Sequence, residues 1–148
     1  MAHKSFPFYN VSHPVGKGGL NYGDDVWVVQ YMLNQLATDP ALAGTTPDSD
    51  LPVNGVYTSA LDDWVFWFQD QLRQRGLPVT VDSRIDPLPA VRNSGYCQEG
   101  MQGMFYTIAH LNATFRRRFP DKHDHLEAQP EMLGIRDRLL NDDYGKPA

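Results

Sequence analysis

Cysteine is almost absent from this chain of 148 residues, since Cys97 is the only one. A single thiol excludes an intrachain disulfide and a metal cage built from several cysteines. No stretch reaches the ~20 consecutive apolar residues that a membrane-spanning helix requires. Basic residues are also scarce in residues 1–90, which contain 5 Lys and Arg against 10 Asp and Glu. Nucleic acids and anionic lipids bind through Lys and Arg, so we expect neither as a partner.

Apolar and aromatic residues are plentiful enough for a folded protein. Hydrophobic residues make up 41% of the chain and aromatic residues 11%, values typical of globular sequences. The length suits one domain, or one small module with an extension. The first ten residues lack the apolar segment of a secretory signal peptide. We therefore expect synthesis in the cytoplasm without a signal peptide.

The first predicted helix begins at Asp24 or Asp25, where a carboxylate can accept hydrogen bonds from the first backbone N–H groups. Apolar residues then recur at helical spacing and form one stripe, made of Val26, Val29, Leu33 and Leu36. Asp39-Pro40 ends this helix. Residues 40–52 are rich in Pro, Gly, Thr and Asp, so we interpret them as an inserted polar connection.

A second helix is predicted after the strong turn dipeptide Asn54-Gly55. Ser59 is its expected N-cap and Asp62 the capping-box partner. Its apolar stripe consists of Leu61, Trp64, Val65, Phe68 and Leu72. Phe66 and Trp67 lie off this stripe. We expect both to pack on the C-terminal part of the chain, and the alternative is a surface that stacks on sugars.

Two further helices are predicted, from about residue 100 to residue 119 and over residues 130–140. The predicted architecture is all-α with at most a few extended residues. The expected core residues are Val26, Val29, Leu33, Leu36, Val56, Leu61, Val65, Phe68, Leu72, Ile108, Leu111 and Phe115.

Two spaced segments carry a family resemblance. The first is Gly23-Asp24-Asp25-Val26 with Val29-Gln30 and Leu33, and the second is Val53-Asn54-Gly55-Val56-Tyr57 with Phe68-Gln69. Together they resemble the peptidoglycan-binding domain-like family over about residues 14–90. Residues 81–87 look like a degraded copy of the first turn, in which Ser83 replaces the usual glycine. The resemblance implies a three-helix bundle at 14–90. Residues 1–13 are then a lead-in, and residues 91–148 are a helical extension that the family lacks, whose two predicted helices we expect to pack on the bundle.

The resemblance also implies a function, namely non-catalytic binding of peptidoglycan in the cell wall. Such a site needs a shallow groove with an aromatic face for a sugar ring and polar groups for N-acetyl and peptide groups. Asn54, Tyr57 and Asp62 are the implied ligand-binding residues, because they lie together at one helix start. The alternative is that Tyr57 fills the core and Asn54 only forms the turn.

Other functions stay open at this point. The same fold could act as a structural or docking protein of a contractile, type VI-like secretion apparatus or of a phage particle. Either system could also carry a wall-binding chain without a signal peptide to its ligand, by non-classical export or as part of a virion. A small peptidoglycan hydrolase is the third hypothesis.

Catalytic and metal-binding signatures are sparse, so we predict no enzyme activity and no cofactor. His123 and His125, flanked by carboxylates, are the candidate zinc ligands, but nothing marks a third ligand. We interpret this segment, residues 121–127, as a solvated polar loop. The other candidates are Cys97 with His110 as a nucleophile pair, and carboxylate pairs drawn from Glu99, Glu127 and Glu131.

Overall fold

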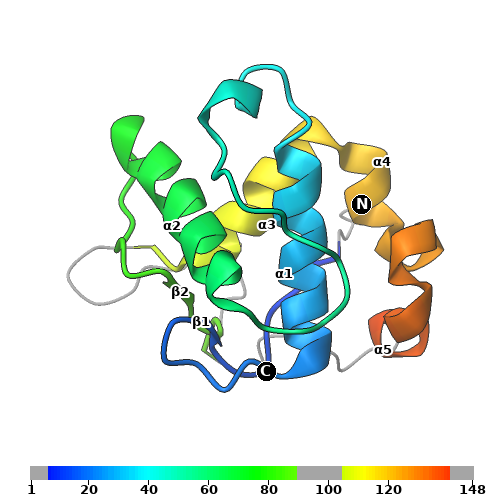
Figure 1. Ribbon diagram of the computed structural model, residues 1–148. Coiled ribbons are helices and arrows are strands. Elements are labelled where there is room, and N and C mark those ends of the chain that lie inside the picture. The colour runs from blue at the N-terminus through cyan, green and yellow to red at the C-terminus, as the bar shows by residue number, and fades with distance from the viewer. Residues whose placement is uncertain (1–6, 90–104, 141–148) are drawn as a thin grey trace.

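The computed structural model describes residues 7–89 and 105–140, which form a mostly helical fold (Figure 1). Three long helices dominate it, namely α1 (Gly23–Leu36), α2 (Ser59–Gln74) and α3 (Thr107–Arg118). Figure 1 shows α1 between α2 on one side and the C-terminal segments on the other. The predicted all-α architecture is therefore confirmed.

Shorter elements complete the described fold. The C-terminal part contains two short helices and two 3-10 turns, in the order α4 (Pro120–Asp124), η3 (Leu126–Ala128), η4 (Pro130–Ile135) and α5 (Arg136–Leu140). The strands found in the described residues are β1 (Val15–Gly16) and β2 (Arg84–Ile85), which pair antiparallel. None of the helices in residues 7–89 and 105–140 is long and apolar enough to cross a membrane.

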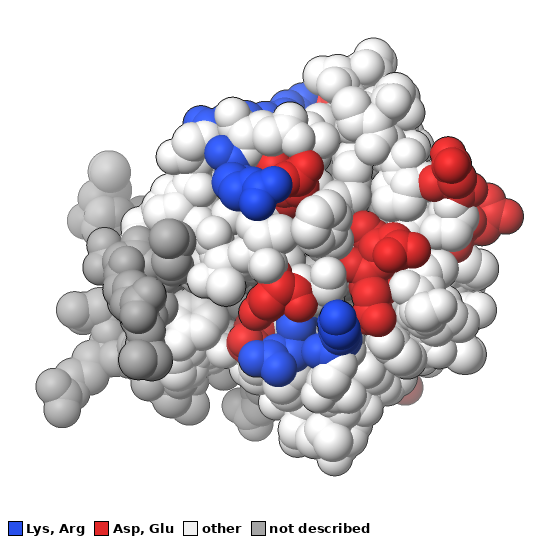
Figure 2. Space-filling model, turned by 60° about the vertical axis from the view of Figure 1, so that its left-hand side comes forward, with Lys and Arg blue, Asp and Glu red and all other residues white. Residues whose placement is uncertain are grey.

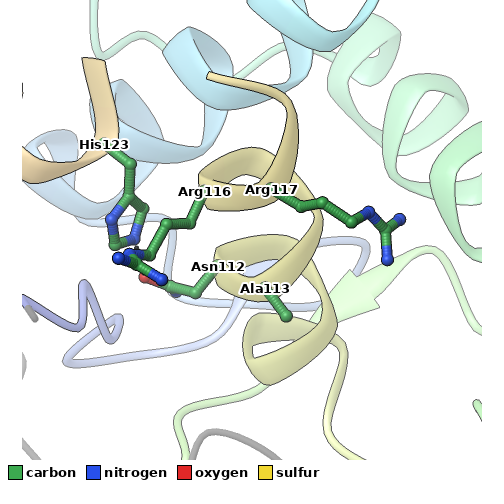
Figure 3. Close-up of a pocket in the computed structure, with 5 residues that line it drawn as sticks. All are labelled: Asn112, Ala113, Arg116, Arg117 and His123. Atoms are coloured by element: carbon green, nitrogen blue, oxygen red, sulfur yellow. Dashed lines mark hydrogen bonds between the residues drawn. The ribbon is translucent and has the colours of Figure 1, made fainter. Parts of the chain in front are cut away.

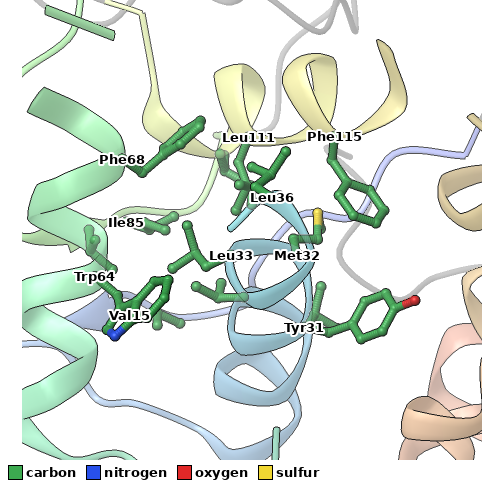
Figure 4. Close-up of a cluster of buried hydrophobic side chains, with 14 of the residues drawn as sticks. Val15, Tyr31, Met32, Leu33, Leu36, Trp64, Phe68, Ile85, Leu111 and Phe115 are labelled. Atoms are coloured by element: carbon green, nitrogen blue, oxygen red, sulfur yellow. The ribbon is translucent and has the colours of Figure 1, made fainter. Parts of the chain in front are cut away.

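The hydrophobic core surrounds α1. Figure 4 shows Leu33 and Leu36 of α1 among Phe68 of α2, Leu111 of α3 and Ile85 of β2. Eleven of the twelve predicted core residues are buried, so the helical stripes read from the sequence are confirmed.

The exception among the predicted core residues is Val56, whose side chain is 58% exposed. Its backbone faces the core instead, because Val56 O accepts a hydrogen bond from Gln30 Nε2 at 3.0 Å. The turn that precedes it contains Gly55 with a φ of 77°, a left-handed conformation that suits glycine. The turn therefore directs this valine outwards.

Asp25 does not cap α1 as predicted. The helix has Tyr22 at its N-cap position and no side-chain capping bond. The Asp25 carboxylate is buried and instead accepts hydrogen bonds from Ser12 N, Ser12 Oγ and His13 N at 3.0, 2.7 and 3.1 Å. This carboxylate therefore fastens the N-terminal segment to the start of the helix.

The predicted start of α2 is wrong by one residue, because Thr58 rather than Ser59 occupies the N-cap position. Asp62 also makes no capping bond; its Oδ2 accepts a hydrogen bond from the Tyr57 hydroxyl.

The third helix begins at Thr107, later than predicted, although residues 100–104 lie outside the described part of the chain. Phe105 forms a parallel bridge with Val79, and Phe105 N donates to Pro78 O at 3.2 Å. This pairing keeps the chain extended immediately before the helix. The predicted helix over residues 130–140 is divided between η4 and α5.

A buried glutamine of α1 holds the first turn in place. Gln30 Oε1 accepts hydrogen bonds from Asn54 N at 3.0 Å and Gly55 N at 2.8 Å, while its Nε2 donates to Val56 O. Within the turn, Asn54 Oδ1 accepts from Val56 N at 2.9 Å. One side-chain amide thus satisfies three backbone groups of the turn, which secondary structure leaves unpaired.

Gln69 of α2 repeats this arrangement at the second turn. Its Oε1 accepts from Asp82 N at 3.0 Å and Ser83 N at 2.9 Å, and its Nε2 donates to Arg84 O at 3.0 Å. Asp82 Oδ1 accepts from Arg84 N, as Asn54 does in the first turn. Ser83 has a φ of 60° where the first turn has glycine. The two helix–turn units are therefore structural copies, although the second has lost its glycine.

The two copies differ in the length of their connections. The bond from Gln30 to Asn54 spans 24 residues, whereas the bond from Gln69 to Asp82 spans 13. The first connection is thus 11 residues longer, close to the 13 residues of 40–52, which agrees with their interpretation as an insertion. This connection contains η1 (Ala43–Thr45).

Tryptophans of α2 hold the inserted connection. Trp64 Nε1 donates to Ser49 O at 2.9 Å, and Trp67 Nε1 donates to Thr45 Oγ1 at 3.0 Å. Phe66 beside them is 44% exposed. Within the described residues, the prediction that Phe66 and Trp67 pack on the C-terminal part of the chain is not met, because the connection lies on this side of α2.

Trp27 of α1 is the tryptophan that joins the C-terminal part. Its Nε1 donates to Glu131 O at 2.9 Å. The indole lies so close to two glycines that a Cβ at Gly55 would be 2.9 Å from one ring carbon, and a Cβ at Gly134 would be 2.4 Å from another. The ring therefore packs between the first turn and η4.

Candidate functional site

The three residues predicted to bind ligand lie at the first turn and the start of α2. The structure brings Tyr57 and Asp62 together, since the Tyr57 hydroxyl donates to Asp62 Oδ2 at 2.8 Å. This hydrogen bond raises the pKa of Tyr57 above its ordinary value. Asn54 is occupied by the turn, where its Oδ1 accepts from Val56 N. Asp62 Oδ1 is buried without a hydrogen-bond partner in the described residues, and it is the feature of this region that favours a ligand.

A groove of about 430 Å³ lies elsewhere on α2, between the helix and the inserted connection. The predicted residues Asn54, Tyr57 and Asp62 do not line it. Thr45 and Pro47 of the connection form one wall. The helix contributes residues spaced three or four apart, which share one face of a helix, namely Asp63, Phe66, Trp67, Asp70, Gln71 and Gln74.

The aromatic part of the groove consists of one exposed and one fixed ring. Phe66 is exposed, whereas Trp67 is only 5% exposed and is held by its bond to Thr45. The rings of Trp64 and Trp67 also meet edge to face, with centroids 5.5 Å apart. The position of the connection, and with it the wall of the groove, is therefore set by the two indoles.

Acidic and amide groups surround these rings. Asp70 pairs with Arg73 and accepts from Gln74 Nε2 at 2.7 Å. Asp63 makes no ion pair within the described residues, and no Lys or Arg of those residues lines the groove. Figure 2, turned to bring the side of α2 forward, shows carboxylates in several groups over the surface, some of them beside Lys or Arg.

A second hollow, of about 300 Å³, lies beside α3 and α4 and is lined by Asn112, Arg116 and His123 among others (Figure 3). Figure 3 shows Arg117 pointing away from His123 and Arg116. Arg116 Nε pairs with Asp124 Oδ1 at 3.2 Å. The cationic groups at this hollow are therefore divided between an internal ion pair and the solvent side of α3.

The prediction of a solvated loop at residues 121–127 is wrong, because His123 belongs to α4 and is 1% exposed. His123 Nε2 lies 3.1 Å from Asn112 Oδ1, and Nδ1 lies 3.2 Å from Asp124 Oδ1. His125 is exposed and follows the end of α4. The described residues contain no group of three or more His, Cys, Asp or Glu side chains that could hold a metal ion.

The polar groups around His123 fasten the N-terminal segment. Asn112 Oδ1 accepts from Tyr9 N and its Nδ2 donates to Tyr9 O, both at 2.9 Å. The Tyr9 hydroxyl donates to His123 O at 2.8 Å. Asn112 Oδ1 and Asp124 Oδ1 are both acceptors, so the neutral imidazole of His123, which has one N–H group, can donate to only one of them at a time. This network uses the hollow's buried polar atoms for structure rather than for a ligand.

Acid is expected to destabilise the fold through His123. Burial lowers the pKa of His123, and the hydrogen bond with Asp124 opposes this shift only in part. The unfolded chain then binds the proton more tightly, so the contribution to stability is complete above about pH 6.5 and is lost as the pH falls below it. Urea unfolding at pH 7.5 and 5.5 measures this loss.

The matched variants for this prediction are His123→Gln and His125→Gln. The first should show a smaller loss of unfolding free energy between the two pH values, and the second should behave as the wild type. If the wild type and His123→Gln lose the same unfolding free energy between pH 7.5 and 5.5, His123 is not the group that makes the fold sensitive to acid.

The remaining catalytic candidates do not assemble in the described residues. Cys97 and Glu99 lie outside them. His110 Nε2 lies 3.0 Å from Pro78 O, to which it donates, so this ring is engaged by the backbone. Glu131 contributes its carbonyl oxygen to Trp27.

Comparison of the chain with protein-family models, with curated proteins and with solved structures gives no match. The structure defines a mostly helical protein with a braced pair of helix–turn units and a groove on α2. The groove is not lined by the residues predicted to bind ligand. The signal for it in the sequence is Phe66, a large aromatic residue off the buried stripe, where a sugar-stacking surface was the alternative expectation.

Proposed function

We propose that this chain is a non-catalytic peptidoglycan-binding module and that the groove on α2 holds the ligand. The groove carries the proposal because it combines an exposed aromatic ring, Phe66, with the amide of Gln71 and the carboxylate of Asp63. Its volume of about 430 Å³ lies within the usual range for small-molecule sites. An aromatic face can cover the apolar face of a sugar ring, while amides and carboxylates can bind N-acetyl groups and peptide amines.

The fold supports the same proposal. Gln30 and Gln69 belong to the two segments that resemble the peptidoglycan-binding domain-like family, and each has an equivalent structural role in bracing a turn. A repeated helix–turn unit gives these sequence positions a physical reason. A shared fold does not by itself fix the ligand, so the proposal depends on the groove.

The groove is a better ligand site than the first turn. Asn54 Oδ1 and the Tyr57 hydroxyl are already bonded inside the protein, and Asp62 Oδ1, although unpaired in the described residues, is buried. A ligand there would have to displace these bonds, and each carries a cost when broken. The side chains of Phe66 and Asp63 face no such competition in the described residues.

Sedimentation with purified sacculi tests the proposal. Wild type should pellet with the sacculi, and Phe66→Ala should weaken binding by about fivefold to tenfold, the loss expected when one aromatic stacking contact is removed. Phe66 is exposed, so its replacement should leave the fold intact. Asp62→Asn is the matched control at the first turn and should bind as the wild type.

Two results would contradict the proposal. Binding that Asp62→Asn abolishes and Phe66→Ala leaves unchanged would place the ligand at the first turn. No pelleting of the wild type would refute wall binding and favour a docking protein of a secretion apparatus or phage particle. The proposed function includes delivery of the chain to the cell wall by a secretion apparatus or a phage particle.

A further inference from the structure

The ionisable side chains of the described residues that line the groove on α2 are all acidic. Its carboxylates are Asp63 and Asp70, and no Lys or Arg of the described residues lines it. Asp70 is engaged by Arg73 and Gln74. Asp63 is exposed and makes no ion pair with the described part of the chain. One carboxylate of the groove is therefore open to a cationic ligand.

The position of Asp63 relative to the aromatic ring strengthens this charge preference. Asp63 and Phe66 are three residues apart on α2 and both line the groove. Side chains three apart are neighbours on a helix surface. A cation bound to the carboxylate would therefore lie near the ring, and the face of an aromatic ring attracts cations.

We propose that the groove selects ligands that carry a free ammonium group, and that Asp63 binds this group. The inference rests on the proposed function, because peptidoglycan supplies free amines from the diamino acid of its peptide and from amino sugars that lack the acetyl group. Both sources present the same chemistry to the carboxylate. Neutral glycans that fit the groove would bind more weakly.

Chemical acetylation of the amines in purified sacculi tests the inference. Acetylation removes the positive charge, so it should weaken wild-type binding by about fivefold, as expected for one exposed ion pair with a cation–aromatic contact. Asp63→Asn should lose the same factor on untreated sacculi and should not respond to acetylation. Asp50→Asn, which removes the same charge from an exposed residue outside the groove, should behave as the wild type.

The outcomes separate this inference from the proposed function. Equal binding of treated and untreated sacculi by wild type and Asp63→Asn would refute amine selection and leave wall binding intact. No binding in either preparation would refute both. Sacculi stripped of their peptides by an amidase identify the source of the bound amine. If acetylation still weakens binding to these sacculi, the amine belongs to the amino sugars. If acetylation has no effect on them, the amine belongs to the peptide.

Discussion

Replacing Gln69 with Leu is expected to lower the free energy of unfolding by about 3–5 kcal/mol. The side chain is fully buried, and its amide satisfies Asp82 N, Ser83 N and Arg84 O, besides donating to Thr107 Oγ1 at 3.0 Å. Leucine has a similar volume, so the loss arises mainly from buried backbone groups left unpaired. Each such group costs about 1–3 kcal/mol.

Urea unfolding of Gln69→Leu and Gln74→Leu provides the measurement and its control. Gln74 lies on the same helix but is exposed, and its amide bonds only Asp70 in the described residues, so its replacement should change stability by no more than about 0.5 kcal/mol. Similar values for the two variants would show that the second turn does not depend on its glutamine.

Trp27→Ala should lower the free energy of unfolding by about 3 kcal/mol. This value is near the lower end of the range for replacing a large aromatic residue with alanine, because Trp27 is half-buried. The variant loses the hydrogen bond to Glu131 O and the contacts with Gly55 and Gly134. Since these contacts join α1 to η4, the C-terminal segment should loosen before the rest of the fold.

Hydrogen exchange, followed peptide by peptide, can detect this local loosening. Amides of residues 126–140 should lose protection in Trp27→Ala, while those of α2 should lose less. Phe66→Ala is the control, because it removes an exposed aromatic ring from another helix. Unchanged protection at residues 126–140 would contradict the role assigned to the indole.

Helical periodicity predicted the three long helices and most of the core, because an amphipathic stripe is a local property of the sequence. Val56 was misplaced because its environment depends on Gln30, 26 residues earlier. The start of α3 was misplaced because Phe105 pairs with Val79. In both cases the local sequence pattern favours one conformation, and a contact with a distant part of the chain imposes a different one.

The candidate site was less accessible to sequence reasoning. His123 was predicted to be solvated because its neighbours are polar, but its burial depends on Asn112, which in turn bonds Tyr9 from 103 residues away. The groove likewise depends on the bond from Trp67 to Thr45, which no local pattern predicts. Helical periodicity placed Phe66 off the buried stripe of α2, but the groove that Phe66 lines exists only once the connection has folded over the helix.

An NMR titration with soluble glycan–peptide fragments can show whether the groove on α2 binds peptidoglycan. We expect the largest changes in amide chemical shift at Asp63, Phe66 and Gln71, and smaller changes at Asn54 and Tyr57. Shift changes concentrated at the first turn would contradict binding in the groove. The absence of shift changes at high fragment concentration would contradict peptidoglycan binding.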